Sequence, residues 1–214
     1  MTQDVWSQRA DAYKESVTHA SGDDLDLLVA WCEPGDGVTA LDVATGGGHV
    51  ARRLREAGAT VVTVDPAPGM GADTTASAEE LPFADESFDV VACRIAAHHF
   101  HDVVTAVKEM ARVAKDRVVI CDNVFVSESG EEADRLRDPS HVRNYSAPEW
   151  HSFFELAGLR VTDEEHFARD TDFEQWLART GCEGEDAARV RELLGDRVVD
   201  GRLSLPTVVL RAVK

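Results

Sequence analysis

Apolar positions along the chain follow two patterns, one typical of buried strands and one typical of amphipathic helices. Short apolar runs predict strands that are buried on both faces of a sheet. These runs cover residues 38–44, 59–65, 87–94, 116–122, 159–161 and 205–213. Apolar residues three and four positions apart predict helices between them. The predicted helices cover residues 3–18, 46–58, 102–114, 146–158, 172–180 and 185–195, and a further helix begins near Leu25.

The alternation of strands with helices predicts the fold class. Such alternation forms βαβ units, and these units build a parallel sheet with helices on its faces. A chain of 214 residues is long enough for one domain of this kind with a sizeable core. We therefore expect a single α/β domain over residues 1–214, without internal repeats or a long linker.

The segment LDVATGGGHVA, residues 41–51, lies where a predicted strand turns into a helix. Glycines at this point let the backbone approach a ligand closely, and the start of the helix offers unpaired N–H groups. Asp42 precedes the turn, and Asp65 ends the next strand. A carboxylate at the end of that strand can accept hydrogen bonds from ribose hydroxyls. We expect both acids at the carboxyl ends of parallel strands, where doubly wound sheets bind their ligands.

Three interpretations of this glycine loop are open at the level of residues. Residues 46–51 fit the GxGxxA pattern of dinucleotide-binding folds, with Asp65 near the position of their acid. Asp42 argues against a pyrophosphate, because a carboxylate and a phosphate repel each other. It favours a ligand with a cationic ammonium group, such as the methionine part of S-adenosylmethionine (SAM). A tight strand–helix turn without a ligand is the third interpretation.

Charge and cysteine content narrow the class of partners. The chain has 22 Lys and Arg against 40 Asp and Glu, a formal net charge of −18. Such a surface repels phosphate backbones and anionic lipid headgroups, so we expect no nucleic-acid partner. No apolar run nears the roughly 20 residues of a membrane span, and the polar N-terminus has no secretory signal. Four scattered cysteines without a CxxC pair are typical of a reducing compartment, so we expect a cytoplasmic protein. The sequence does not specify the oligomeric state.

A second motif carries a family resemblance. Residues 76–102, ASAEELPFADESFDVVACRIAAHHFHD, together with the glycine loop, resemble the class I SAM-dependent methyltransferases, in particular those of ubiquinone and menaquinone biosynthesis. Residues 135–143 and the SxxEW that follows resemble a bacterial subgroup that methylates small molecules. The resemblance implies a Rossmann-like, doubly wound sheet of seven strands in the order 3-2-1-4-5-7-6, with only strand 7 antiparallel. It also implies capping helices over residues 1–33 and a core over residues 37–214 that includes substrate-side helices near its C-terminus.

The resemblance assigns roles to single positions. Asp42 and the backbone of the glycines would hold the methionine part of SAM, and Asp65 would bind the ribose hydroxyls. The loop after the third strand would meet the adenine edge, and the main chain of Arg94 would contact the cofactor. The expected cofactor-binding residues are Asp42, Ala44, Gly46, Gly47, Gly48, Asp65, Pro66, Ser77, Ala78 and Arg94.

Three features depart from the family pattern. Ala44 occupies a position that is usually glycine. Ser77 stands where an aspartate commonly accepts a hydrogen bond from the adenine amino group, and an uncharged hydroxyl makes a weaker bond. Relatives carry a full helix between Met70 and the third strand, but the segment PGMGADTTASAEE leaves no room for one. We expect that helix to be shortened or missing, which would expose apolar surface or open the adenine pocket.

Methyl transfer from a sulfonium mainly requires that nucleophile, methyl group and sulfur lie in line, because the methyl is already activated. An oxygen or carbon nucleophile must also lose a proton, and histidine suits this task near neutral pH. His98 and His99 follow the fourth strand and are the catalytic candidates. The candidate substrate contacts are Tyr13, His19, His141 and Arg143. We expect no metal. The tryptophans expected in the core are Trp6, Trp31, Trp150 and Trp176.

The function that these observations favour is SAM-dependent methyl transfer to a small-molecule acceptor by in-line displacement. Two alternatives stay open. A methyltransferase fold whose pocket is damaged by the missing helix would bind a ligand without catalysing a reaction. An NAD(P)-dependent oxidoreductase would use the same glycine loop, but it needs a catalytic dyad such as YxxxK, which the chain lacks.

Overall fold

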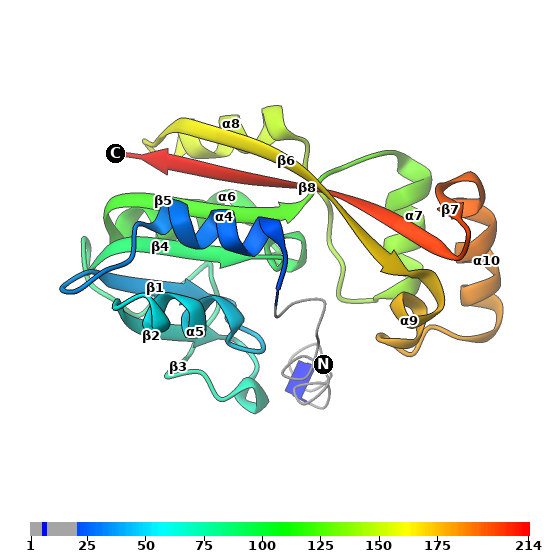
Figure 1. The fold of residues 1–214 in the computed structure, drawn as a ribbon, viewed down its shortest axis with the longest axis horizontal. Coiled ribbons are helices and arrows are strands. Elements are labelled where there is room, and N and C mark those ends of the chain that lie inside the picture. Colours follow the sequence, from blue (N-terminus) through cyan, green and yellow to red (C-terminus); the bar gives the residue numbers. More distant parts are fainter. Residues whose placement is uncertain (1–5, 8–20) are drawn as a thin grey trace.

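The computed structural model describes residues 6–7 and 21–214 of the chain. These residues form one mixed sheet with helices on both faces, and a smaller group of helices lies beyond one end of the sheet (Figure 1). Most of the helix expected over residues 3–18 lies outside the described residues, as do Tyr13 and His19. No helix in the described part of the chain is both long and apolar enough to cross a membrane.

The sheet has the predicted topology. Its strands are β1 (Thr39–Val43), β2 (Thr60–Asp65), β3 (Thr74–Thr75), β4 (Phe88–Arg94), β5 (Ala114–Asn123), β6 (Arg160–Asp172), β7 (Val198–Val199) and β8 (Arg202–Val213). The spatial order is β3-β2-β1-β4-β5-β8-β6, and the short β7 pairs with β8 beside this path. The strands β1 to β5 are parallel, whereas β8 runs antiparallel to both β5 and β6. The predicted order with an antiparallel last strand is therefore confirmed.

Helices cover the two faces of the sheet with separate apolar cores. The helices are α4 (Asp23–Cys32), α5 (His49–Glu56), α6 (Val103–Val113), α7 (Glu128–Arg137), α8 (Ala147–Leu156), α9 (Phe173–Ala178) and α10 (Gly184–Leu194). Because side chains alternate along a strand, Ala40 packs under α4 and α5, and Leu41 packs under α6 and α8. Because β1 to β5 are parallel, their carboxyl ends lie at the same edge of the sheet, where the loops that follow them meet.

The segment after β2 is shortened, as the sequence predicts. A single 3₁₀ turn (Pro68–Met70) replaces a full helix, and β3 has only two residues. Trp6 packs against Ala67 and Met70, and the Gly69 N–H donates to the Ser7 hydroxyl at 3.1 Å. The described part of the N-terminal segment thus covers apolar surface that the absent helix leaves open.

The C-terminal lobe consists of α7, α9, α10, β7 and the ends of β6 and β8 that lie next to them, on the right of Figure 1. It has its own apolar core, in which Ala133 of α7, Trp176 of α9 and Val190 of α10 are buried. The sequence prediction omitted α7 because the segment ESGEEADRLR has almost no apolar periodicity. The sequence also predicts only a short strand, over residues 159–161, where the structure has the long β6. This polar strand pairs with β8 from Arg160 opposite Val213 to Asp172 opposite Arg202.

Candidate active site

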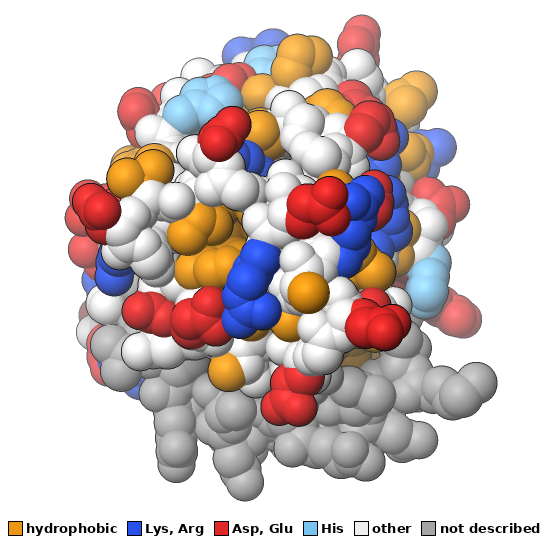
Figure 2. Space-filling view, turned by 90° about the vertical axis from the view of Figure 1, so that its right-hand side faces the viewer, with side chains coloured by type: hydrophobic (Ala, Val, Ile, Leu, Met, Phe, Trp, Pro, Cys, Tyr) orange, Lys and Arg blue, Asp and Glu red, His pale blue; other side chains and the backbone are white. Residues whose placement is uncertain are grey.

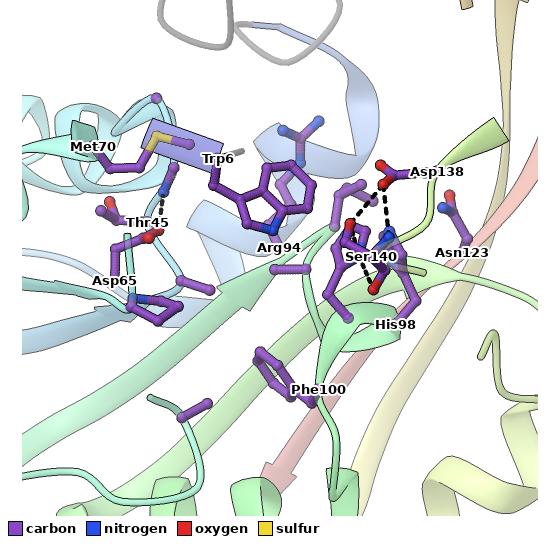
Figure 3. Close-up of a pocket in the computed structure, with 18 of the residues that line it drawn as sticks. Trp6, Thr45, Asp65, Met70, Arg94, His98, Phe100, Asn123, Asp138 and Ser140 are labelled. Atoms are coloured by element: carbon purple, nitrogen blue, oxygen red, sulfur yellow. Dashed lines mark hydrogen bonds between the residues drawn. The ribbon is translucent and has the colours of Figure 1, made fainter. Parts of the chain in front are cut away.

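A cavity of about 270 Å³ lies at the carboxyl ends of the parallel strands and extends to the C-terminal lobe. Figure 3 shows its two sides, with Thr45 and Asp65 on one and His98, Ser140 and Asn123 on the other. The glycine-loop half is walled by Asp42, Ala44, Thr45, Gly46, Gly47, Asp65, Pro66, Ser77 and Ala78. The lobe half is walled by His98, His99, Asn123, Arg137, Asp138, Ser140, Arg169, Thr171, Trp176 and Arg179.

The glycine loop uses left-handed backbone at three positions. Gly46 and Gly48 have φ angles of 50° and 74°, and glycine adopts such values without a steric penalty. Ala44 has a φ of 53°, so the position that is usually glycine in the family does require this conformation. Ile95, directly after β4, also has a positive φ of 52°, which is unusual for a β-branched residue. Strained backbone therefore lines the cavity where β1 and β4 end.

Asp42 ties the loop to the helix that follows. Its Oδ2 accepts hydrogen bonds from the Thr45 hydroxyl at 2.6 Å and from the Ala51 N–H at 3.1 Å. The residue is 1% exposed, and burial raises the pKa of its carboxyl to about 6. A cationic group in the cavity would stabilise the ionised carboxylate and offset this effect.

Asp65 bridges two loops at the end of β2. One oxygen accepts from the Gly46 N–H at 3.0 Å, and the other accepts from the Ala67 N–H at 2.9 Å. Burial raises the pKa of this carboxyl, while the two N–H donors oppose the shift. The carboxylate is therefore held rigidly at the cavity wall, in the orientation that the two loops set.

His98 and Asp122 form a buried pair in the lobe half. The His98 Nδ1 lies 2.6 Å from Asp122 Oδ1, and the His98 main-chain N–H donates to the other carboxylate oxygen at 2.9 Å. Burial acts to lower the pKa of His98, but the Asp122 charge and hydrogen bond outweigh it, so the pKa is raised. The carboxylate assigns the proton to Nδ1 and leaves Nε2 as the basic nitrogen.

His99 lies beside His98 but in a different electrostatic setting. Its Nδ1 is 3.1 Å from the Ser140 carbonyl oxygen, and the Ser140 hydroxyl donates to Asp138 at 2.6 Å. Burial and the neighbouring His98 charge lower the pKa of His99 to about 3. The ring of Trp6 contacts it edge-on, with centroids 4.7 Å apart. His99 is thus held neutral, whereas His98 is the stronger base.

Most of the predicted site residues come together at this cavity. The residues among them that line it are Asp42, Ala44, Gly46, Gly47, Asp65, Pro66, Ser77, Ala78, Arg94, His98 and His99. Gly48 lies just behind the wall as the N-cap of α5. The Arg94 side chain is buried in an ion pair with Asp24 of α4 at 2.8 Å, so its main chain is the part left to face a ligand.

Two predicted substrate contacts do not line the cavity. His141 is buried, and its Nε2 lies 3.1 Å from a Glu131 oxygen of α7. Arg143 is exposed and pairs with Glu149 at 2.7 Å. Both side chains connect the loop between α7 and α8 to those helices, and neither is among the described residues that line the cavity.

The site also contains residues that the sequence prediction missed. Asp122 lies one residue before the end of β5, as Asp42 does in β1, and this shared position near a strand end is a signal that the sequence offers. Trp176 is buried in the core of the lobe, as expected, and both Trp6 and Trp176 also line the cavity, which the sequence analysis did not predict. The missed wall residues Arg137, Asp138 and Ser140 lie within the motif of residues 135–143, whereas nothing in the local sequence marks Arg169 and Arg179.

One cluster among the described residues has the composition of a metal site, formed by Glu131, Asp134 and His141. The Asn144 amide donates to both carboxylates at 2.8 Å, and its main-chain N–H also donates to Glu131. These bonds already join α7 to the loop before α8, which is a sufficient structural role for the cluster.

Known proteins resemble this chain in both sequence and structure. A methyltransferase domain model matches residues 41–121. The uncharacterized methyltransferase YcgJ of Bacillus subtilis is 33% identical over 198 residues, which cover 82% of this chain and 78% of YcgJ. The crystal structure of YcgJ matches with a TM-score of 0.80 and 28% identity, covering 89% of this chain and 97% of that one. The demethylmenaquinone methyltransferase of Thermobifida fusca is 33% identical over 111 residues, 44% of this chain and 47% of that protein.

Proposed function

The chain belongs to the methyltransferase domain family, and from that premise we propose that it transfers a methyl group from SAM to a small-molecule acceptor. The observation that carries this proposal is the pair of buried acids, Asp42 and Asp65, on either side of the glycine loop. Two carboxylates in one half of a cavity suit a ligand that brings a cation and hydroxyl groups, and they disfavour a pyrophosphate.

The residues of the glycine-loop half fit the parts of SAM. Asp65 is held by two main-chain N–H groups, so its carboxylate is preorganised to accept hydrogen bonds from ribose hydroxyls. Asp42 lies on the methionine side, where an ammonium group would stabilise its ionised form. Ser77 and Ala78 line the wall of the same half and would border the adenine. When bound, SAM supplies a methyl group that its sulfonium already activates for in-line displacement.

We assign His98 as the general base, because its pairing with Asp122 leaves Nε2 free to take a proton from the acceptor. The raised pKa strengthens this base, and the buried carboxylate stabilises the imidazolium that forms. His99, whose pKa is lowered to about 3, stays neutral and serves as a hydrogen-bonding contact for the acceptor. Of the two catalytic candidates, only His98 therefore has the electrostatic environment of a base.

The proposal is tested by calorimetric titration of the purified protein with S-adenosylhomocysteine, the product of SAM after methyl transfer, and in parallel with NADH. We expect binding of S-adenosylhomocysteine at micromolar concentration and no binding of NADH. Folding of the same sample is checked by circular dichroism. Binding of NADH alone would favour the oxidoreductase, and a folded protein that binds neither ligand would favour a non-catalytic member of the family.

A further inference from the structure

The lobe half of the cavity is rich in arginine, in contrast to the chain as a whole. Arg137 of α7, Arg169 of β6 and Arg179, directly after α9, all line it. The complete chain has nearly twice as many acidic as basic residues, 40 against 22. The overall composition therefore does not explain why three arginines line one wall of the cavity, and we look for the reason in their surroundings.

Arg169 differs from the arginines on the outer surface of the protein. On the outward face of the C-terminal lobe, acidic and basic side chains lie next to each other (Figure 2). Among the exposed arginines of the lobe, Arg189 pairs with Glu132 at 3.0 Å, and Arg191 pairs with Glu174 at 2.7 Å. Arg169 instead donates to two neutral acceptors, the Thr207 hydroxyl at 3.1 Å and the Asn123 side-chain oxygen at 2.8 Å.

The two carboxylates that act electrostatically on Arg169 already have other partners. Asp24 is paired with Arg94, and Asp122 is paired with His98. No carboxylate of the described residues forms an ion pair with Arg169 itself, although Asp24 and Asp122 act on it from a distance. Burial lowers the pKa of the Arg169 guanidinium, because removal from water disfavours its charged form. An anion from outside would compensate that charge and use the remaining N–H donors.

The position of Arg169 links this anion site to the proposed base. Asn123 holds the Arg169 guanidinium, and its neighbour Asp122 orients His98. Two consecutive residues at the end of β5 thus hold a cation and a base that both line the same cavity. Trp176 also borders the cavity, and its buried ring is stacked with Phe173 and with the Arg137 guanidinium, which lies 4.1 Å from the ring centroid.

From this arrangement, and resting on the proposed methyl transfer, we propose that the acceptor is a small aromatic compound that carries a carboxylate in addition to the atom that is methylated. Arg169 binds the carboxylate, His98 removes the proton from the hydroxyl or acidic carbon that is methylated, and the edge of Trp176 borders the ring. The methyl group then leaves the sulfonium sulfur and bonds to the deprotonated atom, while the C–S bond electrons stay on the sulfur.

The test compares carboxylates with their amides on the complex with S-adenosylhomocysteine. Three matched pairs are titrated: benzoate and benzamide, salicylate and salicylamide, 4-hydroxybenzoate and 4-hydroxybenzamide. We expect at least one carboxylate to bind about tenfold more tightly than its amide, as a charged hydrogen bond to arginine provides. Arg169→Gln should remove this preference, Arg169→Lys should restore part of it, and Arg160→Gln, an exposed control at the start of β6, should keep it.

The outcomes separate this inference from the proposed function. A wild-type protein that fails to bind S-adenosylhomocysteine contradicts the methyltransferase proposal, and this inference with it. A wild-type complex that shows no preference for any carboxylate, because both members of each pair bind equally or neither binds, contradicts this inference alone. Arg169→Gln that weakens S-adenosylhomocysteine binding but keeps the carboxylate preference would assign the arginine to the cofactor's own carboxylate, and would also overturn it.

Discussion

The two halves of the cavity are built on opposite principles. The glycine-loop half is formed by loops that directly follow β1, β2 and β3, and its charged side chains are acids tied to nearby main-chain N–H groups. The lobe half combines segments of α7, β6 and α9, which are far apart in the sequence, with the ends of β4 and β5, and it carries arginines and a histidine pair. One half suits a cationic ligand with hydroxyl groups, and the other suits an anionic one.

This difference separates binding of the cofactor from choice of the acceptor. Loops at strand ends keep their geometry as long as the sheet is intact, so the glycine-loop half can stay constant while the lobe changes. The C-terminal lobe has its own apolar core, and substitutions at its inner surface can alter specificity without disturbing the sheet. If the comparison holds, substitutions in one half should leave the function of the other half unchanged.

The largest effect is expected for His98→Asn in the lobe half. The asparagine amide keeps a donor near Asp122 but removes the basic nitrogen, so methyl transfer should slow by about 10²- to 10⁴-fold. Binding of S-adenosylhomocysteine should remain within about twofold of the wild type. Transfer from radiolabelled SAM to an acceptor found by screening measures the rate, and calorimetry measures the binding.

The exposed His151, which contacts Glu164 on the surface, provides the control, and His151→Asn should leave both quantities unchanged. A His98→Asn protein that transfers methyl groups at the wild-type rate would show that the lobe half contributes no base.

The second effect concerns Asp65→Asn in the glycine-loop half. This change keeps the size of the side chain but removes its charge and one of its two acceptor oxygens. In the wild type, these oxygens accept hydrogen bonds from the Gly46 and Ala67 N–H groups. We expect calorimetry to show roughly 100-fold weaker binding of S-adenosylhomocysteine, from the loss of charge-assisted hydrogen bonds.

Asp36→Asn, at an exposed turn, is the matched control for the loss of one negative charge. An Asp65→Asn protein that binds S-adenosylhomocysteine as tightly as the wild type would contradict the assignment of the glycine-loop half to the ribose.

The pH dependence sharpens the assignment of the base. Because the pKa of His98 is raised, the neutral base is scarce at low pH, and kcat/KM should rise with pH through a midpoint above 6.5. In Asp122→Asn the carboxylate is gone and burial dominates, so the midpoint should move to lower pH and the maximal rate should fall. A pH–rate profile of each variant measures both, and identical midpoints would contradict the role of Asp122.

The smallest effect is expected for Ala44→Gly. Glycine relieves the left-handed conformation at this residue, worth about 1 kcal/mol, but it also increases the freedom of the unfolded chain. We expect the free energy of unfolding to rise by at most about 1 kcal/mol. Ala57→Gly, at a residue with a φ of −88°, should instead lower it by about 0.5 to 1 kcal/mol. Chemical denaturation compares the two, and equal losses would exclude strain at Ala44.

Much of the fold followed from sequence patterns alone. The apolar runs of β1, β2, β4 and β5 are short and buried on both faces, so their periodicity and their ends are visible without a structure. The long β6 was hidden because it is a polar edge strand, whose side chains alternate without a strong apolar face. The helix α7 was hidden for a similar reason, since its stability comes from packing in the lobe and not from its own pattern.

The sequence by itself determined the parallel sheet, the glycine loop, the two acids beside it and the histidines after β4. Each of these depends on residues within one strand and the loop that follows, and a parallel sheet brings such loops to a common edge. Only the tertiary structure decided that Asp122 pairs with His98 and that Arg169 faces the same cavity. The first contact depends on the parallel pairing of β4 with β5, and the second depends on the antiparallel pairing of the polar strand β6 with β8, which its own sequence pattern does not reveal.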